Sequence, residues 1–527
     1  MGHQFNGRKI FFLILDVQMT RSGIEASALT RAALFEKQLG IRPTILTNSY
    51  NWSHDQTRQA LEQESRYQAN FDILNMYDYF QNAVKFKAGK PLRVHDMGFY
   101  RTAPIDLTFD CRAYDQTGAF VAYCKNNEDG SVAYVNHLFS DGFVWRRETY
   151  DTRGFLSKID LLDRKEDKID SQDLYLRPDG TVALVKHCSI ENNIATTKFA
   201  HLVNAQGRMI RSFSAEEVLL QYWLEQLIGE HNNAIFIVDR CHVYSKALNK
   251  ALSAVENDCK VLSVLHNRHT GGDPMSAPVN EYFSCVLKNT STSDGLLIFT
   301  QRQKVDLDQR FDTQNKSRVI PHAHAPVQDV PDLDERDRFK IVYLARYAEE
   351  KQHDKALEAF QKVVKAIPQA QLHLYGFGPQ KDAIEQLIKD TQLSENVFLR
   401  DFVQNVESVY RGAGLSILSS SGEGFVLSIL ESLFCGCPVV AFDVNYGPSA
   451  MILDGVNGFL APPNDVEQMA SRMIEILTNR DLHAHLVSQA NPSVQGFTDE
   501  HVSTLWRVEL ERLVAQPSNQ ISSNLIN

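Results

Sequence analysis

Hydrophobic and polar residues alternate along this chain in patterns that predict an α/β protein. The apolar run IFFLILDV, which begins at Ile10, predicts a buried strand, and the amphipathic stretch from Glu25 to about Leu39 predicts the helix after it. A second buried strand is expected at Pro43–Leu46, in a βαβ unit. From Phe339 onwards the runs FKIVYLA, QLHLYG, NVFLRDF, GLSIL and PVVAF alternate with amphipathic segments, which predicts a second doubly wound parallel sheet.

Between about Pro91 and Phe213 the pattern changes to short alternating segments separated by turn residues. Such segments predict an antiparallel β-meander inserted into the first α/β domain, with hairpin turns at Asp129-Gly130, Pro178-Asp179-Gly180 and Gln206-Gly207. The charged run Asp163–Asp170 is interpreted as a solvated hairpin. A capping box of Ser214 and Glu217 predicts the start of a helix where α/β alternation resumes.

The composition is that of a globular protein with more than one domain. At 527 residues the chain is too long for one ordinary core, and 43% hydrophobic and 23% charged residues are typical of globular proteins. The net charge of −11 disfavours a nucleic-acid binder, because that role needs a basic surface. No run approaches the roughly 20 apolar residues that cross a bilayer, so we expect no membrane span.

Cysteine usage indicates a reducing compartment. The eight cysteines lie in apolar contexts without paired CxxC spacing, which favours buried, reduced thiols over a metal site. The expected location is therefore cytoplasmic, with a peripheral position at the inner face of the membrane as the alternative.

Polar residues follow several strands of the second predicted sheet, where open α/β sheets bind their ligands. Arg346 and Lys351 lie five residues apart on one such loop. A guanidinium and an ammonium together suit the stabilisation of a leaving diphosphate without a metal ion. The alternative interpretation, that both residues form surface ion pairs, stays open.

Two carboxylates flank the start of a predicted helix at about 426–435. If the intervening residues rise by about 1.5 Å each, Glu423 and Glu431 lie roughly 12 Å apart, which suits two hydroxyl-bearing parts of one ligand. The helix N-terminus between them is a natural anion site. Gly376 and Gly378 permit close approach of a ligand, although a plain turn explains them equally well.

These features resemble a known family when taken together. LARYAEEKQ, LHLYGFGP, LRDF, SSSGEGFVLSILESLFCGCPVVAFDVNYGP and DGVNGFL resemble, in order and spacing, the donor domain of retaining glycosyltransferases of family four, which have the GT-B fold. The resemblance implies that Arg346 and Lys351 clamp the diphosphate, that Glu423 binds the donor sugar and that Glu431 binds the ribose. It also implies a donor-binding set of Gly376, Phe377, Gly378, Asp401, Phe402, Gly424 and Phe425.

The N-terminal half resembles one bacterial branch of this family. MYDYFQNA, YVNHLF, RRETYDTRGFLS, LYLRPDG and VLHNRHT resemble wall-teichoic-acid glycosyltransferases and the glycosyltransferases of serine-rich or serine-aspartate-repeat surface proteins. By this resemblance His266 faces the donor sugar and is a catalytic candidate, and Gly23 lets donor phosphate approach the backbone. Asn267, Arg268 and His269 are weaker candidates.

The resemblance implies a UDP-sugar donor with no metal and no cofactor, and front-face attack is the usual interpretation for the family. Glu423 is then a positioning group and not a covalent nucleophile. His322 and His324 have no Asp, Glu or Cys partner on their loop, and we interpret them as hinge packing. Asp306-Leu307-Asp308 imitates a metal-binding DxD motif but lies in a helical pattern, so we interpret it as incidental.

The expected fold class is α/β, a GT-B fold of two Rossmann-like doubly wound domains with an antiparallel β-rich insertion in the first. The predicted segments are 1–90 and 214–325 for the N-terminal acceptor domain, 91–213 for the insertion, 326–497 for the C-terminal nucleotide-sugar donor domain, and 498–527 for a C-terminal helix and disordered tail. The insertion is a candidate platform for acceptor binding, for a homo-oligomer or for a partner subunit, because exposed sheet edges invite pairing.

Three function hypotheses follow. The favoured one is transfer of GlcNAc or glucose to Ser or Thr of a serine-rich surface protein, because the acidic net charge would repel a polyanionic acceptor. The alternatives are glycosylation of poly(glycerol- or ribitol-phosphate) wall teichoic acid, and a catalytically silent GT-B partner subunit. The intact set Arg346, Lys351, Glu423 and Glu431 disfavours the silent subunit.

Overall fold

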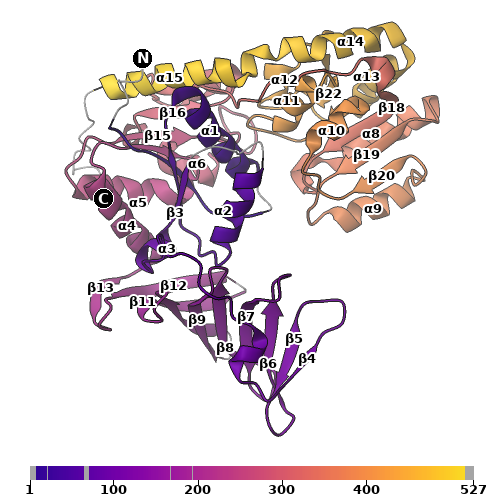
Figure 1. The fold of residues 1–527 in the computed structure, drawn as a ribbon. Coiled ribbons are helices and arrows are strands. Elements are labelled where there is room, and N and C mark those ends of the chain that lie inside the picture. Colours follow the sequence, from indigo (N-terminus) through magenta and orange to yellow (C-terminus); the bar gives the residue numbers. More distant parts are fainter. Residues whose placement is uncertain (1–6, 20–21, 65–70, 166–167, 193, 517–527) are drawn as a thin grey trace. The chain divides into compact units, whose positions relative to one another are not determined.

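The computed structural model describes residues 7–19, 22–64, 71–165, 168–192 and 194–516 (Figure 1). The chain divides into two compact units. Residues 6–36 and 41–260 make up most of the N-terminal unit, and residues 261–517 make up most of the C-terminal unit. The predicted domain ranges do not correspond to these units one by one and stay predictions.

The N-terminal unit contains a parallel sheet in the order β14-β1-β2-β3. Its elements are β1 (Ile10–Ile14), α1 (Gly23–Leu39), β2 (Thr44–Thr47), α2 (His54–Gln63), β3 (Asp72–Asn75), α3 (Met76–Phe80), α4 (Glu216–Glu230), β14 (Ile235–Val238) and α5 (Cys241–Ala254). Every residue of β1 is buried, as expected of a parallel strand covered on both faces. On one side Phe12 meets Phe35 of α1, and Phe11 packs on Phe236 of the neighbouring strand.

Ten antiparallel strands, each paired with the next, form the insertion (Figure 1). They are β4 (Arg101–Pro104), β5 (Cys111–Tyr114), β6 (Phe120–Asn126), β7 (Val132–Leu138), β8 (Val144–Asp151), β9 (Phe155–Arg164), β10 (Ile169–Leu176), β11 (Val182–Glu191), β12 (Ile194–Val203) and β13 (Met209–Phe213). Gly130 and Gly180 adopt φ of 77° and 83° in two of the predicted hairpin turns, a conformation that favours glycine. The predicted antiparallel insertion is confirmed.

Buried charges join this sheet to the α/β part of the same unit. Arg153, in the turn between β8 and β9, contacts Asp151 at 2.7 Å and Asp78 of α3 at 2.9 Å. The same guanidinium donates to the carbonyl of Ala83 at 2.8 Å. A second junction forms where Lys186 of β11 contacts Glu216 of α4 at 2.6 Å. These side chains fix the base of the insertion.

The C-terminal unit contains a six-stranded parallel sheet in the order β20-β19-β18-β21-β22-β23. The chain starts in the middle, at β18, runs outwards through β19 and β20, and returns to continue from β21 in the opposite direction. This is the order of a Rossmann-type doubly wound sheet. The strands are β18 (Asp337–Leu344), β19 (Gln371–Tyr375), β20 (Val397–Arg400), β21 (Ala413–Leu418), β22 (Val439–Phe442) and β23 (Gly458–Ala461).

The remaining elements of this unit include three further parallel strands in the order β15-β16-β17. They are β15 (Lys260–Val264), β16 (Gly295–Ile298) and β17 (Ser317–Val319), with helices α6 (Glu281–Leu287), α7 (Gln301–Arg310), α8 (His353–Ala366), α9 (Lys381–Asp390), α10 (Val406–Arg411), α11 (Leu427–Phe434), α12 (Pro448–Met451), α13 (Val466–Thr478), α14 (Arg480–Ser493) and α15 (Asp499–Ala515). Among the described residues, none of the helices has the length and apolar character needed to cross a membrane.

One predicted local feature is wrong. Helix α4 starts after Ala215 with no side-chain cap, so Ser214 and Glu217 do not form the expected capping box. Glu217 instead bonds to Lys246 and Lys250 of α5 at 2.8 and 3.0 Å. The two cations of a neighbouring helix outcompete a local backbone contact for this carboxylate.

We expect Arg153→Met to lower the free energy of unfolding by about 3–5 kcal/mol, because it leaves Asp78 and Asp151 buried without their cation. The matched control is Arg164→Met, since Arg164 pairs with Asp141 where both side chains are more than half exposed. That change should cost about 1 kcal/mol or less. Urea denaturation of both variants checks the difference, and equal losses would contradict a structural role for the buried pair.

Candidate active site

The candidate site lies at the carboxyl ends of β18 and β21, where the strand order of the sheet reverses. In open α/β sheets this switch point is where ligands bind. The loop after β18 carries Arg346 and Lys351, and the loop after β21 carries Ser419–Glu423. The fold therefore brings the predicted cations and a predicted carboxylate to one edge of the sheet.

Lys351 and Glu423 contact each other directly. Lys351 Nζ donates to Glu423 Oε1 at 2.5 Å, and the side chains are 17% and 14% exposed. Burial is the largest single influence and acts to lower the pKa of the Lys351 ammonium, but the charge and hydrogen bond of Glu423, together with Tyr343 and Glu350, outweigh it and raise the pKa. Lys351 is therefore a permanent cation near neutral pH.

Two side-chain hydroxyl groups fix the backbone of the loop that carries Lys351. Tyr343 of β18 donates its hydroxyl to the carbonyl of Lys351 at 2.6 Å, and Ser419 Oγ donates to the same carbonyl at 2.9 Å. The ring of His353 stacks on Tyr343 with centroids 4.8 Å apart. These contacts hold the ammonium in place before any ligand arrives, which is what electrostatic preorganisation requires.

Arg346 lies at the surface of the same loop. Its side chain is 59% exposed and bonds to Glu350 at 2.6 Å. An exposed pair of this kind contributes little to stability, so the guanidinium is available to exchange its partner for a phosphate. The ion pair considered from the sequence is present, and a ligand role for Arg346 stays a prediction.

Glu423 is held through its backbone by the segment after β22. The amide of Glu423 donates to the carbonyl of Asn445 at 2.8 Å, and the amide of Tyr446 donates back to the carbonyl of Glu423 at 2.5 Å. On the next residue, a Cβ added to Gly424 would lie 2.1 Å from the carbonyl oxygen of His266. Only glycine fits here, and the close approach places the backbone of His266 against that of Gly424.

The His266 ring belongs to an aromatic cluster. It lies 5.3 Å from the ring of Phe299 and 6.1 Å from that of His322, and His322 also meets Phe425 at 5.2 Å. His324 stacks on Phe434 at 4.6 Å. Both His322 and His324 thus pack against aromatic rings.

The weaker candidates after β15 contact the Glu423 loop and the helix α7. Arg268 Nη1 donates to the carbonyl of Ser421 at 3.2 Å, and the carbonyl of Asn267 accepts from Gln303 at 2.9 Å. His269 is fully buried and stacks on Tyr446 with ring centroids 6.0 Å apart. These residues therefore support the candidate site through contacts with the segments next to it.

The loop after β19 carries the predicted Gly-Phe-Gly sequence. A Cβ on Gly376 would lie 2.0 Å from the carbonyl oxygen of Ala345, and one on Gly378 would lie 2.3 Å from that of Tyr347. Packing between the two loops therefore accounts for both glycines. The side chains of Phe377 and Phe402 are 42% and 53% exposed, and their rings meet edge to face at 5.8 Å.

Three further predicted residues lie at separate places. Asp401 is exposed and pairs with Lys381 of α9 at 2.9 Å. Glu431 is partly exposed on α11. Gly23 starts α1 in the N-terminal unit, with open space around its Cβ position. Because α11 begins at Leu427, Glu423 lies in the preceding loop, and the helical rise used to estimate its separation from Glu431 does not apply.

No group of three or more His, Cys, Asp or Glu side chains in the described part of the chain could hold a metal ion. The Asp306-Leu307-Asp308 sequence lies on α7. Asp306 accepts from the Tyr446 hydroxyl at 2.7 Å, and Asp308 accepts from Thr313 at 2.6 Å. Both carboxylates are thus occupied by side chains of the protein.

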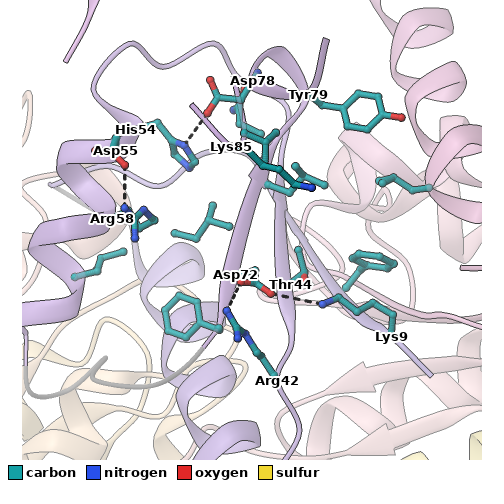
Figure 2. Close-up of a pocket in the computed structure, with 18 of the residues that line it drawn as sticks. Lys9, Arg42, Thr44, His54, Asp55, Arg58, Asp72, Asp78, Tyr79 and Lys85 are labelled. Carbon is teal, nitrogen blue, oxygen red and sulfur yellow. Dashed lines mark hydrogen bonds and ion pairs between the residues drawn. The ribbon is translucent and has the colours of Figure 1, made fainter. Parts of the chain in front are cut away.

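The N-terminal unit has a cavity of about 1400 Å³ between α2 and the sheet, and none of the predicted site residues lines it (Figure 2). Its charges are largely paired within the wall. Lys9 and Arg42 both contact Asp72, and Arg58 contacts Asp55. We assign it no ligand, because the wall satisfies these charges itself.

Sequence reasoning missed two site residues, Tyr343 and Tyr446. Tyr343 lies inside a buried strand, where a tyrosine gives no signal distinct from core packing. Tyr446 was within the quoted motif DVNYGP, which marks it as part of the site without indicating a role.

The comparisons with known proteins now identify this domain. Residues 329–492 match the family model "Glycosyl transferases group 1". The chain carries a group 1 glycosyltransferase domain. The resemblance predicted from the motifs is confirmed.

Two curated relatives match this chain along nearly their whole length. A poly(ribitol-phosphate) alpha-N-acetylglucosaminyltransferase of Staphylococcus aureus is 24% identical over 95% of this chain and 99% of its own. A UDP-N-acetylglucosamine–peptide N-acetylglucosaminyltransferase GtfA subunit of Streptococcus agalactiae is 23% identical over 94% and 96%. The solved structure of the pneumococcal O-GlcNAc transferase GtfA with UDP and GlcNAc has a TM-score of 0.79, 18% identity and coverage of 97% and 100%. The structural likeness confirms the GT-B fold class.

We expect the stability of the glycosyltransferase to fall between pH 6.5 and pH 4, in part because of His353. Burial lowers the pKa of this imidazole to about 4, and neither ring nitrogen has a hydrogen-bond partner. Below pH 6.5 the unfolded chain binds a proton at His353 that the folded protein does not bind. This difference lowers the free energy of unfolding by about 3 kcal/mol at pH 4. His353→Phe keeps the stacked ring and removes this proton. Denaturant melts at pH 7.5 and pH 4.5 should show a smaller loss for the variant, and equal losses would contradict the assignment.

Proposed function

We propose that this protein is a retaining glycosyltransferase that moves GlcNAc or glucose from a UDP-sugar to a hydroxyl of a bacterial cell-surface acceptor. The observation that carries the proposal is the Lys351–Glu423 contact at the switch point of a group 1 glycosyltransferase domain. A preorganised cation next to a carboxylate suits a donor that has a diphosphate on one side and sugar hydroxyls on the other.

We assign each part of the UDP-sugar donor to residues of the site. Arg346 and Lys351 bind the diphosphate, Glu423 accepts hydrogen bonds from sugar hydroxyls, and Glu431 binds the ribose. The exposed rings of Phe377 and Phe402, together with Asp401, bind the uracil base. Backbone groups at Gly376, Gly378, Gly424 and Phe425 complete the contacts within the C-terminal unit. For Gly23 of the N-terminal unit, a contact with donor phosphate stays what the family resemblance implies. The cationic clamp removes the need for a metal ion.

The reaction proceeds on one face of the sugar. The acceptor oxygen forms a bond to the anomeric carbon as the bond to the UDP oxygen breaks, and the acceptor proton passes to the departing phosphate. Arg346 and Lys351 stabilise the negative charge that develops on UDP. His266 lies beside the Gly424 backbone, from which its ring would orient the transferred sugar. Attack and departure on one face retain the anomeric configuration.

The favoured acceptor is Ser or Thr of a serine-rich surface protein. The net charge of −11 would repel a polyanion, and segment 91–213 has 16 Lys and Arg against 17 Asp and Glu, so it offers no basic excess. Instead it exposes large apolar side chains that suit contact with protein, among them Tyr100, Phe109, Phe139, Met209 and Ile210.

A teichoic-acid acceptor is the alternative, supported by the likeness to the ribitol-phosphate enzyme of Staphylococcus aureus. In either case the chain would act on the cytoplasmic side, where UDP-sugars are made, free or at the inner face of the membrane. The end strands β4 and β13 of the insertion are available to a second copy or a partner subunit. The silent-subunit hypothesis is disfavoured by the assembled Lys351–Glu423 pair.

We expect purified protein to transfer sugar from UDP-GlcNAc or UDP-glucose to a serine-rich peptide in the presence of EDTA. Lys351→Ala should lower kcat by about 10²–10³, because it removes charge stabilisation of the leaving UDP. Glu423→Gln should reduce kcat/KM for the UDP-sugar while UDP alone still binds. Mass spectrometry measures transfer, and NMR of the product reports the anomeric configuration.

The matched control is Lys389→Ala, which removes an exposed lysine paired with Glu385 on α9 and should leave activity unchanged. Full activity in Lys351→Ala or Glu423→Gln would refute the site. Transfer to a teichoic-acid polymer but not to the peptide would select the alternative acceptor. An absence of both transfer and donor hydrolysis would favour the silent subunit.

A further inference from the structure

A tyrosine next to the carboxylate loop connects Glu423 to helix α7. The two backbone hydrogen bonds between Glu423 and the Asn445–Tyr446 segment tie the backbone that carries the Glu423 carboxylate to the backbone of Tyr446. Tyr446 is 1% exposed, so its side chain is enclosed by the protein on all sides. What holds this tyrosine therefore also holds Glu423.

The Tyr446 side chain is fixed by two partners. Its hydroxyl donates to Asp306 Oδ2 at 2.7 Å, and the hydrogen bond and burial both raise the pKa of the phenol, with burial the larger cause. Its ring stacks on His269 at an interplanar angle of 14°. His269 itself is anchored by a contact of its Nε2 with the carbonyl of Pro274 at 3.2 Å. The hydroxyl also lies 3.5 Å from His269 Nδ1, so His269 contacts both the ring and the hydroxyl, and Asp306 holds the hydroxyl at the shorter distance.

We propose that Tyr446, anchored by Asp306, is the positioning residue that sets the place of the Glu423 carboxylate. This inference rests on the proposed function, in which Glu423 binds the donor sugar. Asp306 acquires a role that its DxD-like sequence did not indicate. Asp306 accepts a hydrogen bond from the Tyr446 hydroxyl and has no role in metal binding in this proposal.

The geometry explains why a hydroxyl is needed here. Stacking on His269 restrains the ring perpendicular to its plane, but a flat face lets the ring slide within the plane. The hydrogen bond to Asp306 at 2.7 Å is the shorter of the two hydroxyl contacts and restrains this remaining direction more strongly than the 3.5 Å contact with His269. A displacement on the order of 1 Å at a reacting centre reduces rates by about 10²-fold, so a small slide of Tyr446 matters at Glu423.

The experiment compares variants that keep or remove this hydrogen bond. Tyr446→Phe keeps the ring and removes the donor, and Asp306→Ala removes the acceptor. Each should lower kcat/KM for the UDP-sugar by about 10- to 100-fold. Affinity for UDP alone, measured by calorimetry, should stay within about twofold, because Glu423 is assigned to the sugar and not to the nucleotide.

Two further variants separate positioning from general damage. Asp306→Asn retains an oxygen that can accept a hydrogen bond from the Tyr446 hydroxyl, and its activity should lie within a few-fold of that of the wild-type protein. Asp308→Ala removes the other carboxylate of the same helix, which bonds to Thr313. That change should lower the melting temperature without lowering kcat. The double variant Tyr446→Phe with Asp306→Ala should be no worse than either single one, because both delete the same bond.

The outcomes distinguish a failure of this inference from a failure of the proposed function on which it rests. Normal kcat/KM in Tyr446→Phe, together with an inactive Glu423→Gln, would overturn the positioning role and leave the proposed function standing. Equal losses of UDP affinity and of kcat/KM would also overturn it, because they would indicate a damaged domain. An unmodified protein without transferase activity, or a fully active Glu423→Gln, would refute the proposed function itself.

Discussion

The contact between Lys351 and Glu423 is the interaction on which the candidate site depends. It joins two loops that follow adjacent parallel strands, and both side chains are largely buried. A buried ion pair is a poor source of stability, because desolvation offsets much of the attraction. A ligand that uses both charges is a better explanation for the presence of this pair at the switch point of a doubly wound sheet. The surrounding contacts from Tyr343, Ser419 and Tyr446 hold the pair ready for that ligand.

The rest of the C-terminal unit positions these two loops. Close backbone packing recurs at Gly376, Gly378 and Gly424, where any Cβ would overlap a neighbouring carbonyl. Each of these glycines lets one loop rest directly on another, so the site is built from backbone contacts as much as from side chains. The insertion in the N-terminal unit is held differently, because buried charges such as Arg153 join the antiparallel sheet to helix α3.

Much of the fold was predictable because strand and helix periods are strong signals. Continuous apolar runs predicted the parallel strands, and glycine turns such as Gly130 and Gly180 predicted the meander. The site was predictable as a set of residues after strands, since parallel strands end at one edge. Their pairing was not, because Lys351 and Glu423 are 72 residues apart. Tyr446 was missed since its role depends on Asp306, a partner that no local pattern indicates. The failed capping box at Ser214 reflects the same limit.

The most direct test of the account is a crystal structure of the protein with intact UDP-GlcNAc or UDP-glucose bound. We predict a diphosphate in contact with Lys351 and Arg346, sugar hydroxyls hydrogen-bonded to Glu423, and the Glu423 loop still paired with Tyr446. The central claim is that the Lys351–Glu423 pair binds the donor. A donor bound elsewhere would contradict it, and so would a diphosphate that makes no contact with the Lys351 ammonium.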